Sequence, residues 1–163
     1  KRRITVMRKI KKLVATLLAA TMVMAMGVTA FAADSLADGK YTAKQNLYKN
    51  SACTTTSMGD AALNDMRAEI TIADDEATLV VHTHEITYLG LTGHLGKMVV
   101  NGKTVTPKQT TTNGVTDYYF TFTGLDASTI YEGCVITGKF TTYVGSMPMN
   151  ATGYLKLTDI TAK

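Results

Sequence analysis

The stretch at residues 117–123 reads Asp-Tyr-Tyr-Phe-Thr-Phe-Thr, and its side chains alternate in character from one residue to the next. Because successive side chains of a β-strand point to opposite faces, Tyr118, Phe120 and Phe122 share one face. Tyr119 and two threonines share the other. One fully aromatic face beside one hydroxyl-rich face is typical of an antiparallel strand that buries a single side. The stretch therefore predicts a strand whose aromatic face lies in a core.

Similar segments recur along the chain from residue 40 onward. They are short runs rich in Thr, Val, Ile and Tyr, interrupted by Gly, Asn and Asp about every ten residues. We expect strands at Lys40–Tyr48, Arg67–Ile72, Ala77–Tyr88, Gly96–Asn101, Thr104–Pro107, Asp117–Thr123, Cys134–Val144 and Gly153–Ile160. Turn signals separate them at Asp74-Asp75, Asn101-Gly102, Asn113-Gly114 and Gly145–Asn150. The pattern predicts an all-β fold, a β-sandwich of about eight strands.

One segment departs from the strand pattern. Ser57–Asn64 is small and helix-tolerant, and it opens with a residue that commonly caps helices. We expect one short helix here, after the first strand, lying over an end or edge of the sandwich like a lid over a groove. In the last two strands, alternation directs Tyr143 and Tyr154 away from the core. A turn centred on Pro148-Met149 places these two tyrosines opposite one another.

The chain has 163 residues, which is room for one ordinary domain. Seven of its 17 basic residues precede residue 13, and they are followed by the apolar run Leu13–Val28 and by Ala30-Phe31-Ala32. This order is typical of a signal peptide, so we predict residues 1–32 as signal, with cleavage after Ala32. Residues 33–37 form a short tail and 38–163 the β-sandwich domain. We expect a secreted or cell-surface location.

Removing the signal reverses the sign of the charge. Ten basic side chains remain against all 13 acidic ones, a net charge of about −3. The remaining Lys and Arg are scattered, which argues against nucleic acid as a partner. The chain has no second long apolar run, so we expect no membrane insertion of the mature domain. Two cysteines remain, Cys53 and Cys134, which form either a disulfide worth about 4 kcal/mol or two free thiols.

Four segments in order along the chain resemble the NEAT (near iron transporter) family. They are Asp38–Thr42, Ser57–Leu63, Lys97–Lys103 and the closing stretch Tyr154–Asp159. NEAT domains are immunoglobulin-like sandwiches on Gram-positive cell surfaces that bind haem or haemoproteins. The resemblance covers about residues 38–160. It implies that haem lies between Ser57–Leu63 and the final hairpin.

The resemblance also implies roles for individual residues. Ser57 hydrogen-bonds a haem propionate and Met58 faces the iron. The family's Tyr-x-x-x-Tyr motif supplies the iron ligand from its first tyrosine, but here that position holds Asn150, and only the supporting Tyr154 matches. Met147 and Met149 flank Pro148, where the family brings its ligand to the iron.

A thioether suits haem iron. Met58 with Met147 or Met149 reproduces the two-methionine ligation of some haem-transfer relatives. Tyr143 completes the expected set of cofactor-binding residues on the hairpin.

Histidines support a competing interpretation. His82 and His84 share one face of a predicted strand, and an i, i+2 pair can chelate zinc or copper. His94 is a third donor ten residues further on, in a Gly-rich connection. No hydrolase, metalloprotease or phosphate-loop motif is present and the carboxylates are dispersed, so we do not expect an enzyme.

The sequence thus predicts an exported module that captures or relays haem without transforming it. Its expected partners are haem, haemoproteins and other surface haem-transfer proteins. The alternatives are a protein-recognition or adhesion module of the same fold without cofactor, and a histidine-based zinc or copper site.

Overall fold

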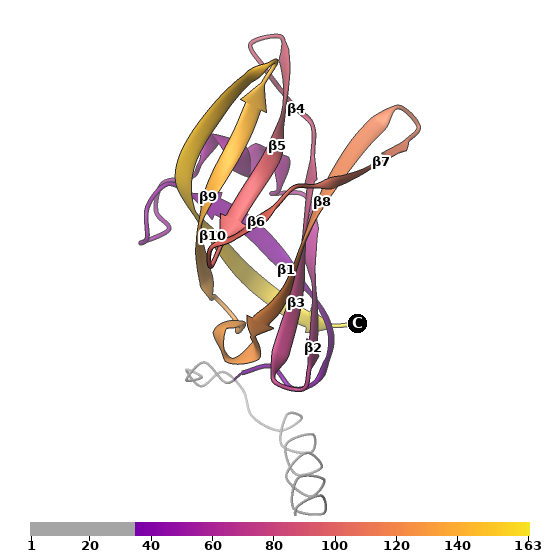
Figure 1. Cartoon of the computed structure of the whole chain (residues 1–163), viewed down its shortest axis with the longest axis vertical. Coiled ribbons are helices and arrows are strands. Elements are labelled where there is room, and N and C mark those ends of the chain that lie inside the picture. The colour runs from indigo at the N-terminus through magenta and orange to yellow at the C-terminus, as the bar shows by residue number, and fades with distance from the viewer. Residues whose placement is uncertain (1–34) are drawn as a thin grey trace, which may run out of the picture. The chain divides into compact units, whose positions relative to one another are not determined.

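The computed structural model describes residues 35–163, so the predicted signal peptide lies outside the described part of the chain. This part contains ten strands and two short 3-10 helices (Figure 1). The strands are β1 (Gly39–Tyr48), β2 (Arg67–Ala73), β3 (Glu76–His84), β4 (Ile86–Tyr88), β5 (Leu91–Val100), β6 (Lys103–Val105), β7 (Lys108–Thr112), β8 (Val115–Asp126), β9 (Val135–Val144) and β10 (Met147–Ala162). The helices are η1 (Met58–Ala62) and η2 (Ala127–Thr129).

All strand pairs are antiparallel, in the order β4-β5-β9-β10-β1-β2-β3-β8-β7, with β6 added beside β5. The sheet folds over on itself, so that β5, β9 and β10 form one layer and β2, β3 and β8 the other (Figure 1). Side chains of both layers meet in one core, for example Met98 and Phe140 from the first with Ile70 and Phe120 from the second. The predicted all-β sandwich is confirmed.

The alternation predicted for residues 117–123 is confirmed. Tyr118, Phe120 and Phe122 are buried in the core, as are Leu155 and Leu157 from the last strand. Three predicted turns have the left-handed backbone that their residues favour: Asp74-Asp75, Asn101-Gly102 and Asn113-Gly114 all have positive φ angles.

The strand count differs from the prediction for two reasons. The expected strand Ala77–Tyr88 breaks at Glu85. Before the break β3 pairs with β8, and after it β4 pairs with β5. Strand β7 was not predicted, because its Lys-Gln-Thr-Thr-Thr sequence has no apolar alternation. All five of its side chains are exposed, and it joins the sheet through backbone pairing with β8.

The predicted centre of the last hairpin is wrong. The turn is Gly145-Ser146, and Gly145 adopts a φ of 58° that glycine tolerates. Strand β10 therefore begins at Met147 and includes Pro148, which pairs with Tyr143. Tyr154 pairs with Thr137, so the two tyrosines do not lie opposite one another.

Gly153 offers a test of how tightly the two layers pack. A Cβ atom at this position would lie 2.7 Å from Phe140 Cδ2 and 3.0 Å from Leu47 Cδ1, both in the core. Gly153→Ala should therefore lower the free energy of unfolding by about 1–3 kcal/mol through overpacking, measured by urea denaturation. Thr152→Ala, at the exposed neighbouring position, is the control and should change it by about 0.5 kcal/mol or less. Equal stability of Gly153→Ala and the parent would contradict this packing.

Candidate functional site

Helix η1 is fixed to the end of β1 by backbone and carboxylate hydrogen bonds. The backbone N–H of Ser57 donates to the Leu47 carbonyl at 2.8 Å. The buried carboxylate of Asp60 accepts from the Leu47 N–H at 2.6 Å and from Asn46 Nδ2 at 3.3 Å. Ser57 Oγ accepts from the Gly59 N–H at 3.3 Å, which confirms the predicted helix cap. These contacts set where the helix lies over the sandwich.

A groove of about 330 Å³ lies between η1 on one side and strands β4 and β9 on the other, and we call it the helix–hairpin groove. Its lining is mainly apolar, because Met58, Ala61, Ile86 and Val144 contribute alongside small polar groups. The lining residues are Thr56, Ser57, Met58, Asp60, Ala61, Asn64, Ile86, Thr87, Thr142 and Val144. This volume is at the lower end of the range for small-molecule sites.

The hairpin methionines extend from the strand next to this groove. Met147 pairs with Val144, and Met149 pairs with Thr142. Residues directly opposite one another on paired strands share a sheet face, so both methionines lie on the face that lines the groove. Met58 is 43% exposed, Met147 61% and Met149 47%. One accessible thioether, that of Met58, therefore lines the groove, and the two hairpin thioethers lie on the same sheet face in the next strand.

The predicted tyrosines lie on the other face of the hairpin. Tyr154 pairs with Thr137 and Asn150 with Thr141, and the Thr141 hydroxyl donates to Asn150 Oδ1 at 2.7 Å. Tyr143 lies on the same side as Thr141 by alternation along β9. Of the residues predicted to bind a cofactor, Ser57 and Met58 line the groove. Met147 and Met149 lie on the groove face of the neighbouring strand, and Tyr143 and Tyr154 lie on the opposite face.

The three histidines are in separate environments. His84 engages both ring nitrogens, Nδ1 with the Glu85 carbonyl at 2.6 Å and Nε2 with Asp65 Oδ1 at 2.8 Å. His82 lies beside Tyr119 at a ring-centroid distance of 6.3 Å. His94 is in strand β5, not in the Gly-rich connection that the sequence predicted. Within residues 35–163 no group of three or more His, Cys, Asp or Glu side chains is arranged to hold a metal ion.

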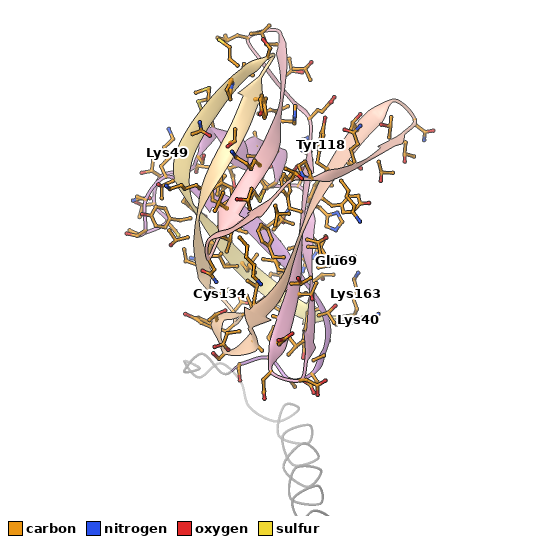
Figure 2. All side chains as sticks on the ribbon, in the orientation of Figure 1. Lys40, Lys49, Glu69, Tyr118, Cys134 and Lys163 are labelled. Atoms are coloured by element: carbon orange, nitrogen blue, oxygen red, sulfur yellow. The ribbon has the colours of Figure 1, made fainter. Side chains whose placement is uncertain are left out.

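His94 belongs to an aromatic stack that sequence reasoning missed. Its ring stacks on Tyr118 at a centroid distance of 4.9 Å and on Tyr143 at 5.4 Å. The stack links β8 to β5 and β9, and Figure 2 labels Tyr118 where it approaches from β8. No local pattern could have revealed it, because the three residues come from strands far apart in sequence.

The phenol of Tyr118 also donates to Glu85 Oε1 at 2.9 Å. Burial and the neighbouring Glu85 carboxylate raise the pKa of Tyr118 to about 12. The folded chain therefore keeps this proton at a pH where an unfolded tyrosine, with its pKa of about 10, has lost it.

The free energy of unfolding should accordingly fall as the pH rises from about 10 to about 12. Tyr118→Phe should make this decline shallower, because it removes the proton that the folded state retains. Urea midpoints at a series of alkaline pH values measure the effect. Tyr131→Phe, which removes a phenol elsewhere in the domain, is the control. An unchanged slope in Tyr118→Phe would refute the raised pKa of Tyr118.

Both cysteines are free thiols, Cys53 partly exposed and Cys134 buried. Burial raises the pKa of the Cys134 thiol, which disfavours the reactive thiolate. Of the two states that the sequence left open, the structure has the reduced one. As for membranes, none of the described helices has the length and apolar character needed to cross a bilayer.

No protein-family model matches the chain, and a search of curated protein sequences finds no relative. The family resemblance therefore remains a prediction from the residues quoted above.

Proposed function

We propose that the helix–hairpin groove binds haem and that the protein captures or relays it without chemical change. The observation that carries the proposal is the position of the three thioethers. Met58 borders the groove from η1, and Met147 and Met149 flank its lining strand from β10. Thioether sulfur is a soft, neutral donor that suits haem iron.

The residues present fit the chemistry of a porphyrin better than that of a polar ligand. Met58, Ile86 and Val144 supply apolar surface for the macrocycle. The groove volume of about 330 Å³ accommodates part of the ring, so the exposed hairpin methionines must cover the remainder. Bound haem iron supplies reversible ligation and electron exchange.

Ser57 has a role at the polar rim. Its Oγ already accepts from the Gly59 N–H, which leaves the hydroxyl hydrogen to donate to a propionate. Thr56 and Asn64 add further polar groups beside it. No described lining residue is basic, so propionate binding here relies on neutral donors and solvent. Neutral donors hold a carboxylate weakly, and this is consistent with a module that passes its ligand on.

We further propose that the protein is exported and exchanges haem with other proteins. The basic and apolar N-terminal stretch and the net negative remainder support a secreted or cell-surface protein that exchanges haem with haemoproteins or other surface haem-transfer proteins. The proposed function includes no catalytic step by this chain.

A second candidate, protein recognition, is favoured by one observation. Four large apolar side chains are exposed near the ends of two hairpins: Leu89, Leu91, Met147 and Met149. The two hairpins meet where the Gly145 N–H donates to the Thr92 carbonyl at 2.8 Å. A protein partner docking on this end would use the same methionines, without any cofactor.

Titration of the purified protein with hemin distinguishes the two candidates. Haem binding predicts a saturable, sharpened Soret band at one haem per chain with the low-spin spectrum of thioether ligation. Met58→Leu keeps apolar volume but removes the sulfur, so it should abolish the low-spin spectrum while some haem still binds. The double variant Met147→Leu with Met149→Leu should weaken retention and also lose that spectrum. Met66→Leu, outside the groove, is the matched control.

Two results would overturn the proposal. Hemin absorbance that rises linearly without saturation would exclude a haem site, and protein recognition would then be the remaining candidate function. A low-spin spectrum that survives all three Met→Leu changes would show that the iron ligand lies elsewhere.

A further inference from the structure

A second groove lies on the opposite face of the β9–β10 hairpin from the helix–hairpin groove. It is an open depression of about 420 Å³ over β5, β9 and β10, which Figure 1 draws side by side. We call it the outer groove. It is lined by Lys97, Val99, Lys139, Thr141, Asn150, Ala151 and Thr152.

The register of the three strands arranges these side chains in two rows. Lys97 pairs with Thr141, which pairs with Asn150. In the next row Val99 pairs with Lys139, which pairs with Thr152. The two lysines are therefore diagonal neighbours on one face, close enough to contact a single extended ligand.

The groove also carries oriented neutral donors. Thr141 Oγ1 donates to Asn150 Oδ1 at 2.7 Å, which fixes the amide and leaves Asn150 Nδ2 free to donate to a ligand. Thr152 adds a hydroxyl in the adjacent row. Among the described residues that line this groove, none is acidic.

Charge is unevenly divided between the two layers. Strands β1, β5, β9 and β10 contain five lysines and a single acidic residue: Lys40, Lys44, Lys97, Lys139, Lys156 and Asp159. Strands β2, β3 and β8 contain four acidic residues and one basic residue: Glu69, Glu76, Asp117, Asp126 and Arg67. The strands around the outer groove thus carry a net positive charge on a domain that is net negative, and two of their lysines line the groove, which favours an anionic ligand at this face.

Tyrosines extend the same face beyond both ends of the groove. Tyr154 pairs with Tyr48 and lies two residues along β10 from Thr152. Tyr143 follows Thr141 by two residues, and its ring lies so close over Gly96 that a Cβ atom there would overlap Tyr143 Cε2. Thr137, the partner of Tyr154, is six residues from Tyr143 along β9, a span of roughly 20 Å. Aromatic faces at this spacing can stack on the C–H faces of sugar rings in an extended chain.

We propose that this face binds a carboxylate-bearing polysaccharide, of the uronic-acid class. Lys97 and Lys139 pair with its carboxylates, and Asn150 and Thr152 donate to its hydroxyl groups. Tyr154 and Tyr143 stack on its rings at either end. An anionic polymer without sugar rings would satisfy the lysines but leave the tyrosines without a partner, so the sugar is the part that the whole face recognises.

Binding of the purified protein to soluble polygalacturonate, followed by calorimetry at low and physiological salt, tests the proposal. Lys97→Gln with Lys139→Gln should weaken binding roughly tenfold, since each removes a charge-assisted hydrogen bond. The matched control is Lys108→Gln with Lys163→Gln, which changes net charge equally. Lys108 lies on β7, and Lys163 pairs with Glu69 of the other layer, as labelled in Figure 2. The control should bind like the parent.

Tyr154→Ala should weaken binding roughly fivefold, whereas Tyr154→Phe, which keeps the ring, should not. Equal losses in the lysine pair and its control would show attraction by net charge alone and overturn the proposal. Binding of inorganic polyphosphate as tight as that of polygalacturonate, with no effect of Tyr154→Ala, would assign the face to a phosphate polymer instead. No binding of polygalacturonate by the parent protein would also refute it.

Discussion

The buried carboxylate of Asp60 links the one helix that covers the sandwich end to the strand beneath it. It accepts hydrogen bonds from the Leu47 backbone and the Asn46 side chain, so helix η1 cannot move away from β1 without leaving a buried acceptor and a strand N–H unpaired. A loss of this kind costs about 1–3 kcal/mol or more when a charge is involved. The position of Met58 and Ser57, and therefore the width of the helix–hairpin groove, depends on this contact.

The other wall of the groove depends on strand parity. Because Leu155 and Leu157 are core residues, odd-numbered side chains of β10 from Met147 to Leu157 face the core or the groove, and even-numbered side chains in this range face outward. This rule directs Met147 and Met149 to the groove, and Asn150, Thr152 and Tyr154 to the opposite face. One hairpin therefore offers thioethers on one side, and amide, hydroxyl and phenol groups on the other. The two proposals concern these two faces and do not share a side chain.

Much of the fold could be predicted from local sequence. Alternation identified Phe120 and Phe122 as core residues, and Asn-Gly pairs identified two hairpin turns. The turn of the last hairpin could not be located, because Gly145 and Pro148 are both turn formers and only strand pairing decides between them. The last strand was predicted to begin at Gly153, whereas it begins at Met147. Asn150 was therefore placed in a turn, and its sheet face could not be predicted by alternation.

The candidate site was predictable in part. Ser57 and the methionines follow from capping preference and from the resemblance. The structure places Ser57 and Met58 in the lining of one groove, and Met147 and Met149 on the same face of the strand beside it. The histidines show the limit of local reasoning. Their i, i+2 spacing indicated a chelate, but His84 is engaged at both nitrogens and His94 is stacked between Tyr118 and Tyr143. Contacts between strands that are distant in sequence determine these environments, and a strand pattern contains no information about them.

The proposed function requires a porphyrin to bind between η1 and the inner face of the hairpin. Methyl NMR of ¹³C-methionine protein, titrated with diamagnetic gallium protoporphyrin, tests it most directly. Residues 35–163 contain five methionines: Met58, Met66, Met98, Met147 and Met149. A porphyrin bound there should cause large ring-current shifts for Met58, Met147 and Met149, and small ones for Met66 and the core residue Met98. Unshifted methyls at Met58 and Met149 while porphyrin is bound would contradict it.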